Sequence, residues 1–294
     1  MQIKSNGITL EAETYGDPAN PALILIRGLG TQLVHWPDAL VQGFARAGFF
    51  TVVFDNRDIG LSQRCPAPGV PDDPDEIMTR ARAGEDIAPA YTLSDMAQDV
   101  IGLMDALELP RAHVFGISMG GAIAQILALD HGDRILTDTI VMTAARPLLD
   151  PEHRAQILPR LIVRPETLDE AQDNWVAGHA SFGSPGYPMP EEDIRAEART
   201  AYARGSDAAG INRQLLATMA APDRRAALGD VTTPCLVIHG IDDTLIPEPM
   251  GAEIAACIPG AEYHALKGMG HIITPLLAPT IVSLVSDFIR RNGG

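Results

Sequence analysis

The sequence of 294 residues contains little cysteine, and no two of its three cysteines are spaced as a pair. Cys65 lies in a proline-rich stretch, Cys235 in an apolar run typical of a buried strand, and Cys257 in a helical pattern. An odd number of scattered cysteines argues against a disulfide framework and against a zinc site built on thiolates. We therefore expect three reduced thiols and no bound metal.

Positive charge is also scarce, because 22 lysines and arginines stand against 38 aspartates and glutamates, which gives a formal net charge of −16. No cluster of basic residues offsets this excess anywhere along the chain. An anionic surface repels both the phosphates of nucleic acids and the headgroups of anionic membranes. The composition therefore predicts no nucleic-acid partner and no membrane partner.

Long apolar runs are missing as well. No stretch of the sequence is long enough to cross a bilayer. Residues 1–16 also lack the apolar core and the cleavage site of a secretory signal peptide. These absences predict a soluble, cytoplasmic protein.

Short apolar runs alternate with helical patterns over most of the chain, whose hydrophobic fraction is 46%. The runs at 22–26 and 49–54 are apolar throughout, which is typical of strands buried on both faces of a parallel sheet. Helices cover both faces of such a sheet, and its functional residues lie at the carboxyl ends of its strands. Strands are predicted at 9–15, 22–26, 49–54, 112–115, 135–142, 235–239 and 263–266, and helices at 38–47, 92–107, 122–129, 250–257 and 276–290.

Strand patterns are absent between residues 146 and 222, where amphipathic helical runs alternate with a loop. We expect a helical cap of residues 146–222 that folds over the sheet edge, inserted into an α/β core domain formed by residues 1–145 and 223–294. The larger apolar side chains of the cap form either its own small core or the walls of a substrate pocket. They are Trp175, Phe182, Tyr187, Met189, Tyr202, Leu215 and Met219. Trp175 and Met219 are the apolar candidates for the pocket, and Asn212 and Arg213 are the polar ones.

The pentapeptide Gly116-Ile117-Ser118-Met119-Gly120 lies between an apolar strand and an alanine-rich helical run. Strand, Gly-x-Ser-x-Gly and helix are the context of a nucleophile elbow, in which the serine adopts a strained backbone conformation with positive φ. Glycines two residues before and after the serine let the strand and the helix approach each other. The alternative is a glycine-rich turn with an ordinary serine.

A serine hydroxyl becomes a good nucleophile only when a base takes its proton, and that base is usually a histidine oriented by a carboxylate. His271 is the candidate base, because it follows the last strand in a glycine-rich loop; its alternative role is to cap the last helix. Asp243 is the candidate carboxylate, at the offset Gly-x-x-Asp after a strand. Asp242 is the second choice, with a structural role in an Asx turn, and we expect His239 to pack at the strand end.

The tetrahedral oxyanion of acyl transfer needs two preorganised N–H donors. The backbone N–H of Met119 is one candidate, since it lies at the start of the helix after the elbow. The N–H of Leu29 is the other, in a loop where Gly28 and Gly30 let the backbone approach a ligand. The alternative is a plain glycine turn.

Taken together, these motifs resemble those of esterases of the α/β-hydrolase fold family. The matching residues are Arg27-Gly28-Leu29-Gly30, Asp55-x-Arg57-x-x-Gly60-x-Ser62, Gly116-x-Ser118-x-Gly120, Gly240-x-x-Asp243-x-x-x-Pro247 and Gly268-x-Gly270-His271. Within the fold, the chain is most similar to the aclacinomycin methylesterase-like branch, through residues 114–120, 128–131, 259–261 and 268–271. The resemblance covers nearly the whole chain apart from the cap, and the order Ser, Asp, His along the chain is the one that the fold uses.

The chain departs from this family at Arg27, where many members have a histidine. The charge of Arg27 would lie beside the site, either paired with Asp55, Asp58 or Asp95 or in contact with the substrate. Residues 55–58 are themselves rich in carboxylates, which can bind hard cations. We expect this turn to brace the neighbouring loops instead.

The sequence therefore predicts a serine carboxylesterase that hydrolyses a small to medium ester through an acyl-enzyme, without a metal or an organic cofactor. A lactonase, a carbon–carbon bond hydrolase or a cofactor-free perhydrolase would use the same three side chains. A ligand-binding protein on the same fold is the non-enzymatic alternative. The expected partner is a small-molecule ester, and the chain could form a homodimer.

Overall fold

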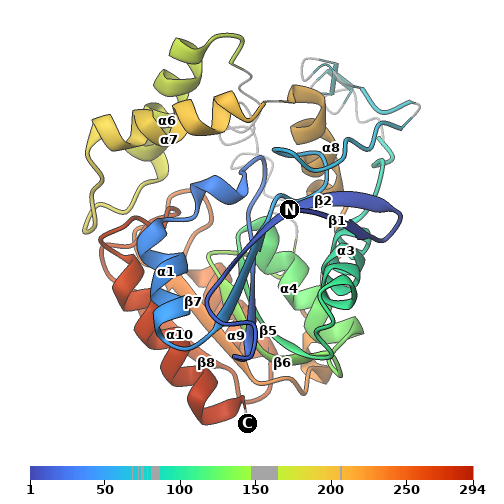
Figure 1. The fold of residues 1–294 in the computed structure, drawn as a ribbon, viewed down its shortest axis with the longest axis vertical. Coiled ribbons are helices and arrows are strands. Elements are labelled where there is room, and N and C mark those ends of the chain that lie inside the picture. The colour runs from blue at the N-terminus through green and yellow to red at the C-terminus, as the bar shows by residue number, and fades with distance from the viewer. Residues whose placement is uncertain are drawn as a thin grey trace.

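A computed structural model describes residues 1–67, 69–71, 73, 76–77, 79–80, 87–146, 165–205 and 207–293. The described chain is built around one sheet of eight strands in the order β1-β2-β4-β3-β5-β6-β7-β8 (Figure 1). From β4 to β8 all neighbouring strands are parallel, and β1 and β2 are antiparallel to their neighbours. The strands are β1 (Gln2–Ser5), β2 (Ile8–Tyr15), β3 (Ala22–Ile26), β4 (Phe50–Phe54), β5 (Ala112–Ile117), β6 (Ile135–Val141), β7 (Cys235–Gly240) and β8 (Glu262–Leu266).

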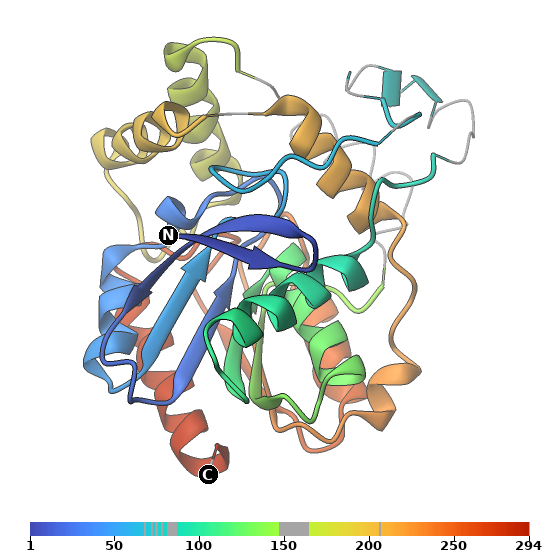
Figure 2. The same ribbon diagram turned by 45° about the vertical axis from the view of Figure 1, so that its right-hand side comes forward.

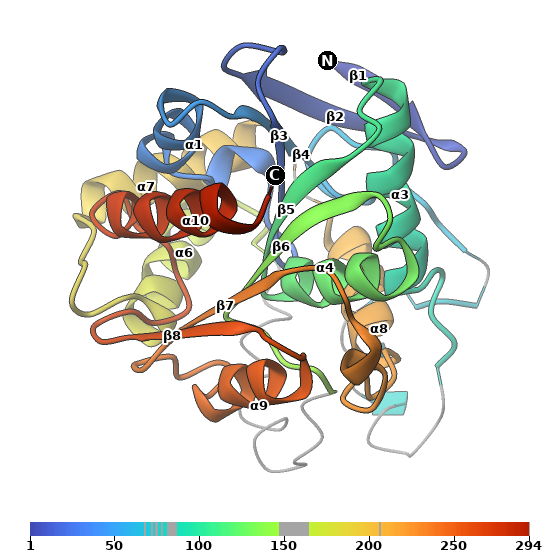
Figure 3. The ribbon, with the colours of Figure 1, turned by 90° about the horizontal axis from the view of Figure 1, so that it is seen from below.

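Helices cover both faces of this sheet, as the view from below shows (Figure 3). On one face, α1 (Asp38–Arg46) and α10 (Ala278–Asn292) bury side chains such as Phe44 and Val285. On the other face, α3 (Leu93–Ala106), α4 (Met119–Asp130) and α9 (Pro249–Cys257) form a second core with the opposite side chains of the strands. Two short 3₁₀ helices, η1 (Leu33–His35) and η2 (Ala227–Asp230), lie in connecting segments. The predicted α/β architecture is thus confirmed, including every predicted strand and core helix.

The first strand was not predicted from the sequence. β1 pairs with β2 through a tight turn at Asn6 and Gly7, whose φ angles of +46° and +78° suit these two residue types. In β1 only Ile3 is apolar, and the strand alternates between exposed and buried positions. Four residues with one apolar side chain give too weak an alternation to be recognised without the turn.

Three helices cross the carboxyl end of the sheet (Figure 2). They are α6 (Leu168–Phe182), α7 (Glu191–Ala203) and α8 (Ala208–Met219). Thr167 caps α6 by accepting a hydrogen bond from the N–H of Glu170, whose side chain bonds back in a capping box. Residues 147–164, the first part of the predicted cap, lie outside the described residues. The division into core and cap at 145/146 and 222/223 stays a prediction.

Ion pairs with buried carboxylates join the cap helices to the turn after β4. Arg204, at the end of α7, lies 2.6 Å from the Asp55 carboxylate. Arg213 of α8 holds the Asp58 carboxylate with two nitrogens, at 2.8 and 3.0 Å. Asp55 also accepts hydrogen bonds from the N–H groups of Leu33 and Leu61. The carboxylates of this turn therefore brace the neighbouring segments, as expected from the sequence.

Among the described residues, no helix combines the length and the apolar character needed to cross a membrane.

Asp138 of β6 is an unusual member of the core. It is fully buried, and neither carboxyl oxygen has a hydrogen-bond partner in the described part of the chain. Burial raises the pKa of this carboxyl to about 8. Between about pH 4 and pH 8 the unfolded chain releases a proton that the folded protein keeps, so the free energy of unfolding falls as the pH rises.

Replacing Asp138 with asparagine should remove this dependence on pH. At pH 7 we expect the variant to be more stable by about 4 kcal/mol, because roughly 1.4 kcal/mol per pH unit acts over about three units. Near pH 4 the two proteins should be equally stable. Urea unfolding of both proteins at the two pH values measures the difference, and a difference independent of pH would contradict the titration of Asp138.

Candidate active site

Ser118 lies at the sharp junction between β5 and α4. Its backbone has φ +55° and ψ −121°, the positive-φ conformation expected of an elbow. The flanking glycines are required by close packing. A Cβ atom on Gly116 would lie 2.2 Å from the carbonyl oxygen of Gly120, and one on Gly120 would lie 2.2 Å from that of Ile26. The turn therefore excludes side chains at both positions and leaves the Ser118 hydroxyl at the carboxyl end of the sheet.

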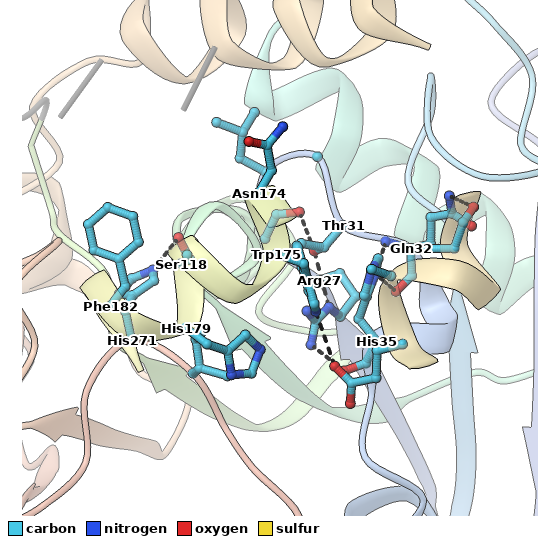
Figure 4. Close-up of a pocket in the computed structure, with 18 of the residues that line it drawn as sticks. Arg27, Thr31, Gln32, His35, Ser118, Asn174, Trp175, His179, Phe182 and His271 are labelled. Carbon is cyan, nitrogen blue, oxygen red and sulfur yellow. Dashed lines mark hydrogen bonds between the residues drawn. The ribbon is translucent and has the colours of Figure 1, made fainter. Parts of the chain in front are cut away.

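His271 and Asp243 extend from this hydroxyl in a line of hydrogen bonds. The Nε2 atom of His271 lies 3.0 Å from Ser118 Oγ (Figure 4), and its Nδ1 atom lies 2.7 Å from Asp243 Oδ2. The three residues follow β5, β8 and β7 respectively. The structure thus brings together the three side chains that the sequence singled out, from loops up to 153 positions apart.

The Asp243 carboxylate is buried and fully engaged. Its Oδ1 atom accepts hydrogen bonds from the N–H groups of Leu245 and Ile246, each at 2.9 Å, and His239 lies 3.5 Å from Oδ2. Burial alone would raise the pKa of this carboxyl. The charge of His271 and the hydrogen bonds to the carboxylate outweigh burial and hold the pKa well below its usual value. Asp243 therefore stays ionised across the neutral range.

Asp242, the acid next to Asp243 in the sequence, has a different role. Asp242 is exposed and accepts a hydrogen bond from the N–H of Gly268 at 2.7 Å. It joins the loop after β7 to the loop that carries His271. His239 is buried at the end of β7, as predicted, and its Nε2 atom lies 2.9 Å from the carbonyl oxygen of Ile246.

The end of α6 and the segment that follows it hold the histidine loop in place. The backbone N–H of His271 donates to the carbonyl oxygen of Phe182 at 2.7 Å. The buried hydroxyl of Ser184 donates to the carbonyl oxygen of Ile272 and accepts from the N–H of Gly270. The imidazole is therefore positioned by the cap side of the molecule as well as by the sheet.

The loop after β3 places Gly28 directly against Ser118, where an added Cβ atom would lie 3.1 Å from the serine Cβ. Met119 is the first residue of α4, so its N–H has no acceptor within the helix. No acceptor for the N–H of Leu29 or Met119 occurs in the described residues. By contrast, the next N–H of the loop, that of Gly30, donates to the side-chain oxygen of Gln214 at 3.0 Å.

Gln214 thus fixes the loop that presents the Leu29 N–H. It is fully buried in α8, and its amide also donates to the carbonyl oxygen of Arg57. Replacing Gln214 with leucine should lower kcat about tenfold with little change in KM. The reason is that a displaced Leu29 N–H weakens the stabilisation of the transition state but not the binding of the substrate. Kinetics on a p-nitrophenyl ester measure this.

A matched control for this variant is Gln125→Leu. Gln125 is equally buried and hydrogen-bonded, but it lies farther along α4 and does not line the cavity described below. Both variants should lower the melting temperature, whereas only Gln214→Leu should lower kcat. An equal loss of kcat in both variants would refute a positioning role for Gln214.

A cavity of about 330 Å³ opens above Ser118 and His271 (Figure 4). Arg27 and Gly28, which the sequence predicts beside the site, and Trp175, which it predicts in the pocket, all line this cavity. Met219 does not, which corrects the sequence-based prediction. Helix α8 reaches the cavity only with its first turn, through Ile211, and Met219 lies about 12 Å farther along the helix axis.

Some of the other candidates from the predicted cap line the cavity and others do not. Phe182, Met189 and Tyr202 line the cavity, whereas Tyr187 packs against the core and Leu215 is buried in α8. Arg213 and Asn212 are also buried and do not line it, since Arg213 points to Asp58. Several lining residues were not predicted from the sequence, namely His35, Asn174, His179 and Glu197. These four lie on helices whose patterns carry no local sign of a site.

Arg27 has none of the three predicted ion-pair partners. Asp55 and Asp58 are occupied by Arg204 and Arg213, and the Asp95 side chain caps the start of α3. The Arg27 guanidinium instead donates to the hydroxyl of Thr31 at 3.1 Å and to the carbonyl oxygen of His35 at 3.2 Å. The prediction of a structural ion pair was therefore wrong.

Comparisons with known proteins agree with this fold. Residues 21–275 match the model of the family described as the alpha/beta hydrolase fold, and the chain belongs to this family. It is 28% identical over 292 residues to the rhodomycin D methylesterase DnrP of Streptomyces peucetius, covering 92% of this chain and 91% of the relative. It is 29% identical to the rhodomycin D methylesterase DauP of Streptomyces sp. strain C5, with the same coverage.

A solved structure extends the comparison. The enol-lactonase of Burkholderia xenovorans LB400 has a TM-score of 0.76 and 28% identity to this chain, and the match covers 99% of this chain and 100% of the lactonase. The resemblance to esterases of the α/β-hydrolase fold is thus confirmed at the level of family and relatives.

Proposed function

We propose that this hydrolase is a serine carboxylesterase that cleaves a small to medium carboxylic ester through an acyl-enzyme. The observation that carries the proposal is the continuous line of hydrogen bonds from Ser118 through His271 to Asp243. The methylesterases among its relatives support ester cleavage.

In the first half of the reaction, Ser118 Oγ attacks the ester carbonyl carbon while Nε2 of His271 takes the hydroxyl proton. The carbonyl oxygen becomes an oxyanion, which the N–H groups of Leu29 and Met119 stabilise. The carbon–oxygen bond to the alcohol then breaks, and His271 returns its proton to the leaving alkoxide. Asp243 holds the imidazole in the tautomer that accepts from Ser118 and stabilises the imidazolium that forms.

In the second half, a water molecule takes the place of the alcohol. His271 accepts a proton from this water as its oxygen attacks the acyl carbon, and then returns the proton to Ser118 as the acid leaves. No other group is required to balance the reaction. Apolar and aromatic walls near Ser118, including Ile117, Phe182 and Leu245, suit a hydrocarbon chain, and the volume of the cavity suits a small to medium ester.

A lactonase is a second candidate, because a lactone is a cyclic ester that the same attack would open. The similarity to the enol-lactonase of Burkholderia xenovorans favours it over a carbon–carbon bond hydrolase or a perhydrolase. An acyclic ester and a lactone of the same acid, compared at equal concentration, separate the two.

Labelling with a fluorophosphonate tests the proposed nucleophile. We expect stoichiometric modification of the peptide that contains Ser118, in step with the loss of activity on p-nitrophenyl butyrate, and no labelling of the denatured protein. Ester hydrolysis that persists after complete exposure to the reagent, with Ser118 unmodified, would overturn the assignment.

A further inference from the structure

Arg27 is a buried charge beside the proposed catalytic site. The residue is only 8% exposed and lines the cavity. Its guanidinium carbon lies 4.5 Å from the centre of the Trp36 ring, so that ring covers one face of the group. Arg27 is the one permanent cation among the described residues that line the cavity.

The hydrogen bonds of Arg27 leave part of its guanidinium unused. Nε and Nη1 each donate to a neutral oxygen, and Nη2 has no acceptor among the described residues. The group makes no ion pair within the described part of the chain. A guanidinium has five N–H donors, so at least three of them remain available to a ligand.

Other buried arginines of this protein are satisfied. Arg57 and Arg213 each hold a carboxylate with two nitrogens, on Asp99 and Asp58. Arg224 has no carboxylate, but each of its three guanidinium nitrogens donates to an oxygen of the protein. Among these four buried arginines, Arg27 alone combines the lack of a carboxylate with an unused nitrogen at a cavity.

None of the described groups around Arg27 forms an ion pair with it. Burial lowers the pKa of His179 to about 4, and burial together with the Arg27 charge lowers the pKa of His35 to about 3, so both rings are uncharged at neutral pH. Glu197 of α7 is the acid that acts on Arg27 through space, but it makes no ion pair with it and accepts from the Trp175 indole N–H at 3.3 Å. Burial also raises the pKa of the Glu197 carboxyl.

The site therefore has two ends. Figure 4 shows Ser118, His271 and Phe182 on one side, and Arg27, Thr31, Gln32 and His35 on the other, with Trp175 between them. A buried cation without a counter-ion is costly, and a carboxylate with two oxygens matches the geometry of a guanidinium. A substrate that supplies this carboxylate gains an interaction that the protein itself leaves open.

We propose that Arg27 binds a free carboxylate of the substrate, so that the preferred ester carries a second, unesterified acid group on its acyl part. This inference rests on the proposed esterase function and deepens it. Trp175 provides the apolar surface along which the connecting chain lies. Glu197, at the same end of the cavity, limits this binding through its negative charge and sets the selectivity together with Arg27.

The test compares methyl monoesters of straight-chain dicarboxylic acids with their dimethyl diesters over a series of chain lengths. The measured quantity is the ratio of kcat/KM for the monoester to that for the diester, at fixed ionic strength because the net charge of −16 repels anions. We expect a ratio of at least about ten at one preferred chain length, because a charge-assisted hydrogen bond between the Arg27 guanidinium and the free carboxylate stabilises binding by about this factor. A ratio below one at every length, with good hydrolysis of the diesters, would overturn the inference and leave the esterase function intact.

Variants separate the two charges. Arg27→Gln should lower the ratio at least about tenfold, Arg27→Lys should lower it less, and Glu197→Gln should raise it. Arg224→Gln is the matched control, because it removes a buried arginine that does not line the cavity and should leave the ratio unchanged. If Arg27→Gln does not fold, an unchanged ratio in Glu197→Gln contradicts the proposal on its own.

A binding measurement keeps this inference distinct from the reaction. In the Ser118→Ala variant, calorimetry should show binding of the preferred monomethyl dicarboxylate. In the double variant that carries Ser118→Ala and Arg27→Gln, this binding should be at least about tenfold weaker. Equal affinity in both proteins would overturn the role of Arg27, whatever the outcome for Ser118.

Discussion

Replacing Ser118 with alanine should lower kcat on a p-nitrophenyl ester by a factor of at least about 10⁴, because the proposed acyl-enzyme forms on the serine Oγ atom that the variant lacks. The fold should be unaffected, since alanine tolerates the same backbone conformation as serine and the elbow is held by the packing of Gly116 and Gly120. Steady-state kinetics and a melting curve measure the two effects separately.

The matched control is Ser286→Ala. This serine is also buried, lies in α10 away from the cavity, and its hydroxyl has no hydrogen-bond partner among the described residues. Its loss should leave kcat unchanged. Activity of Ser118→Ala near that of the wild type would contradict the proposed nucleophile, whereas an equal loss in both variants would indicate damage to the fold.

Replacing Asp243 with asparagine should lower kcat by roughly 10³–10⁴-fold. The reason lies in the two backbone N–H groups of Leu245 and Ile246, which both donate to Oδ1. They would retain the amide oxygen of asparagine on their side and turn its NH₂ group toward Nδ1 of His271. The ring would then carry its proton on Nε2, facing Ser118, and could not accept the serine proton.

Asp242→Asn is the control, since it changes the adjacent residue in the same way. Its amide oxygen can still accept from the N–H of Gly268, so we expect kcat to change less than about threefold. Proton NMR of the imidazole should also show the altered tautomer in Asp243→Asn only. Similar losses in the two variants would contradict the assignment of Asp243 as the orienting carboxylate.

Much of this arrangement follows from local sequence. Apolar runs such as residues 22–26 fix strands, and the glycines around Ser118 are required by contacts that any elbow makes. The offset from Gly240 separates Asp243 from Asp242, since only the former turns inward beneath His271 while the latter reaches the neighbouring loop. These relations depend on a few consecutive residues and can be recognised in one sequence.

The features that could not be predicted from the sequence depend on how the cap helices pack against the core. The partners of Arg27 could not be predicted, because Asp55 and Asp58 bind arginines that lie about 150 residues away along the chain. Met219 was misplaced for the same reason, as the direction of α8 decides which of its ends reaches the cavity. The role of Gln214 could not be recognised either, because the sequence shows only a polar residue in a helical pattern and does not show that the residue is buried.

The most direct test of the proposed mechanism is a crystal structure of the protein after reaction with a fluorophosphonate. The mechanism predicts a phosphorus atom bonded to Ser118 Oγ, with one phosphoryl oxygen about 2.7–3.1 Å from the backbone nitrogens of both Leu29 and Met119 and the His271 ring beside it. An adduct on another residue, or a phosphoryl oxygen that points away from both N–H groups, would contradict it.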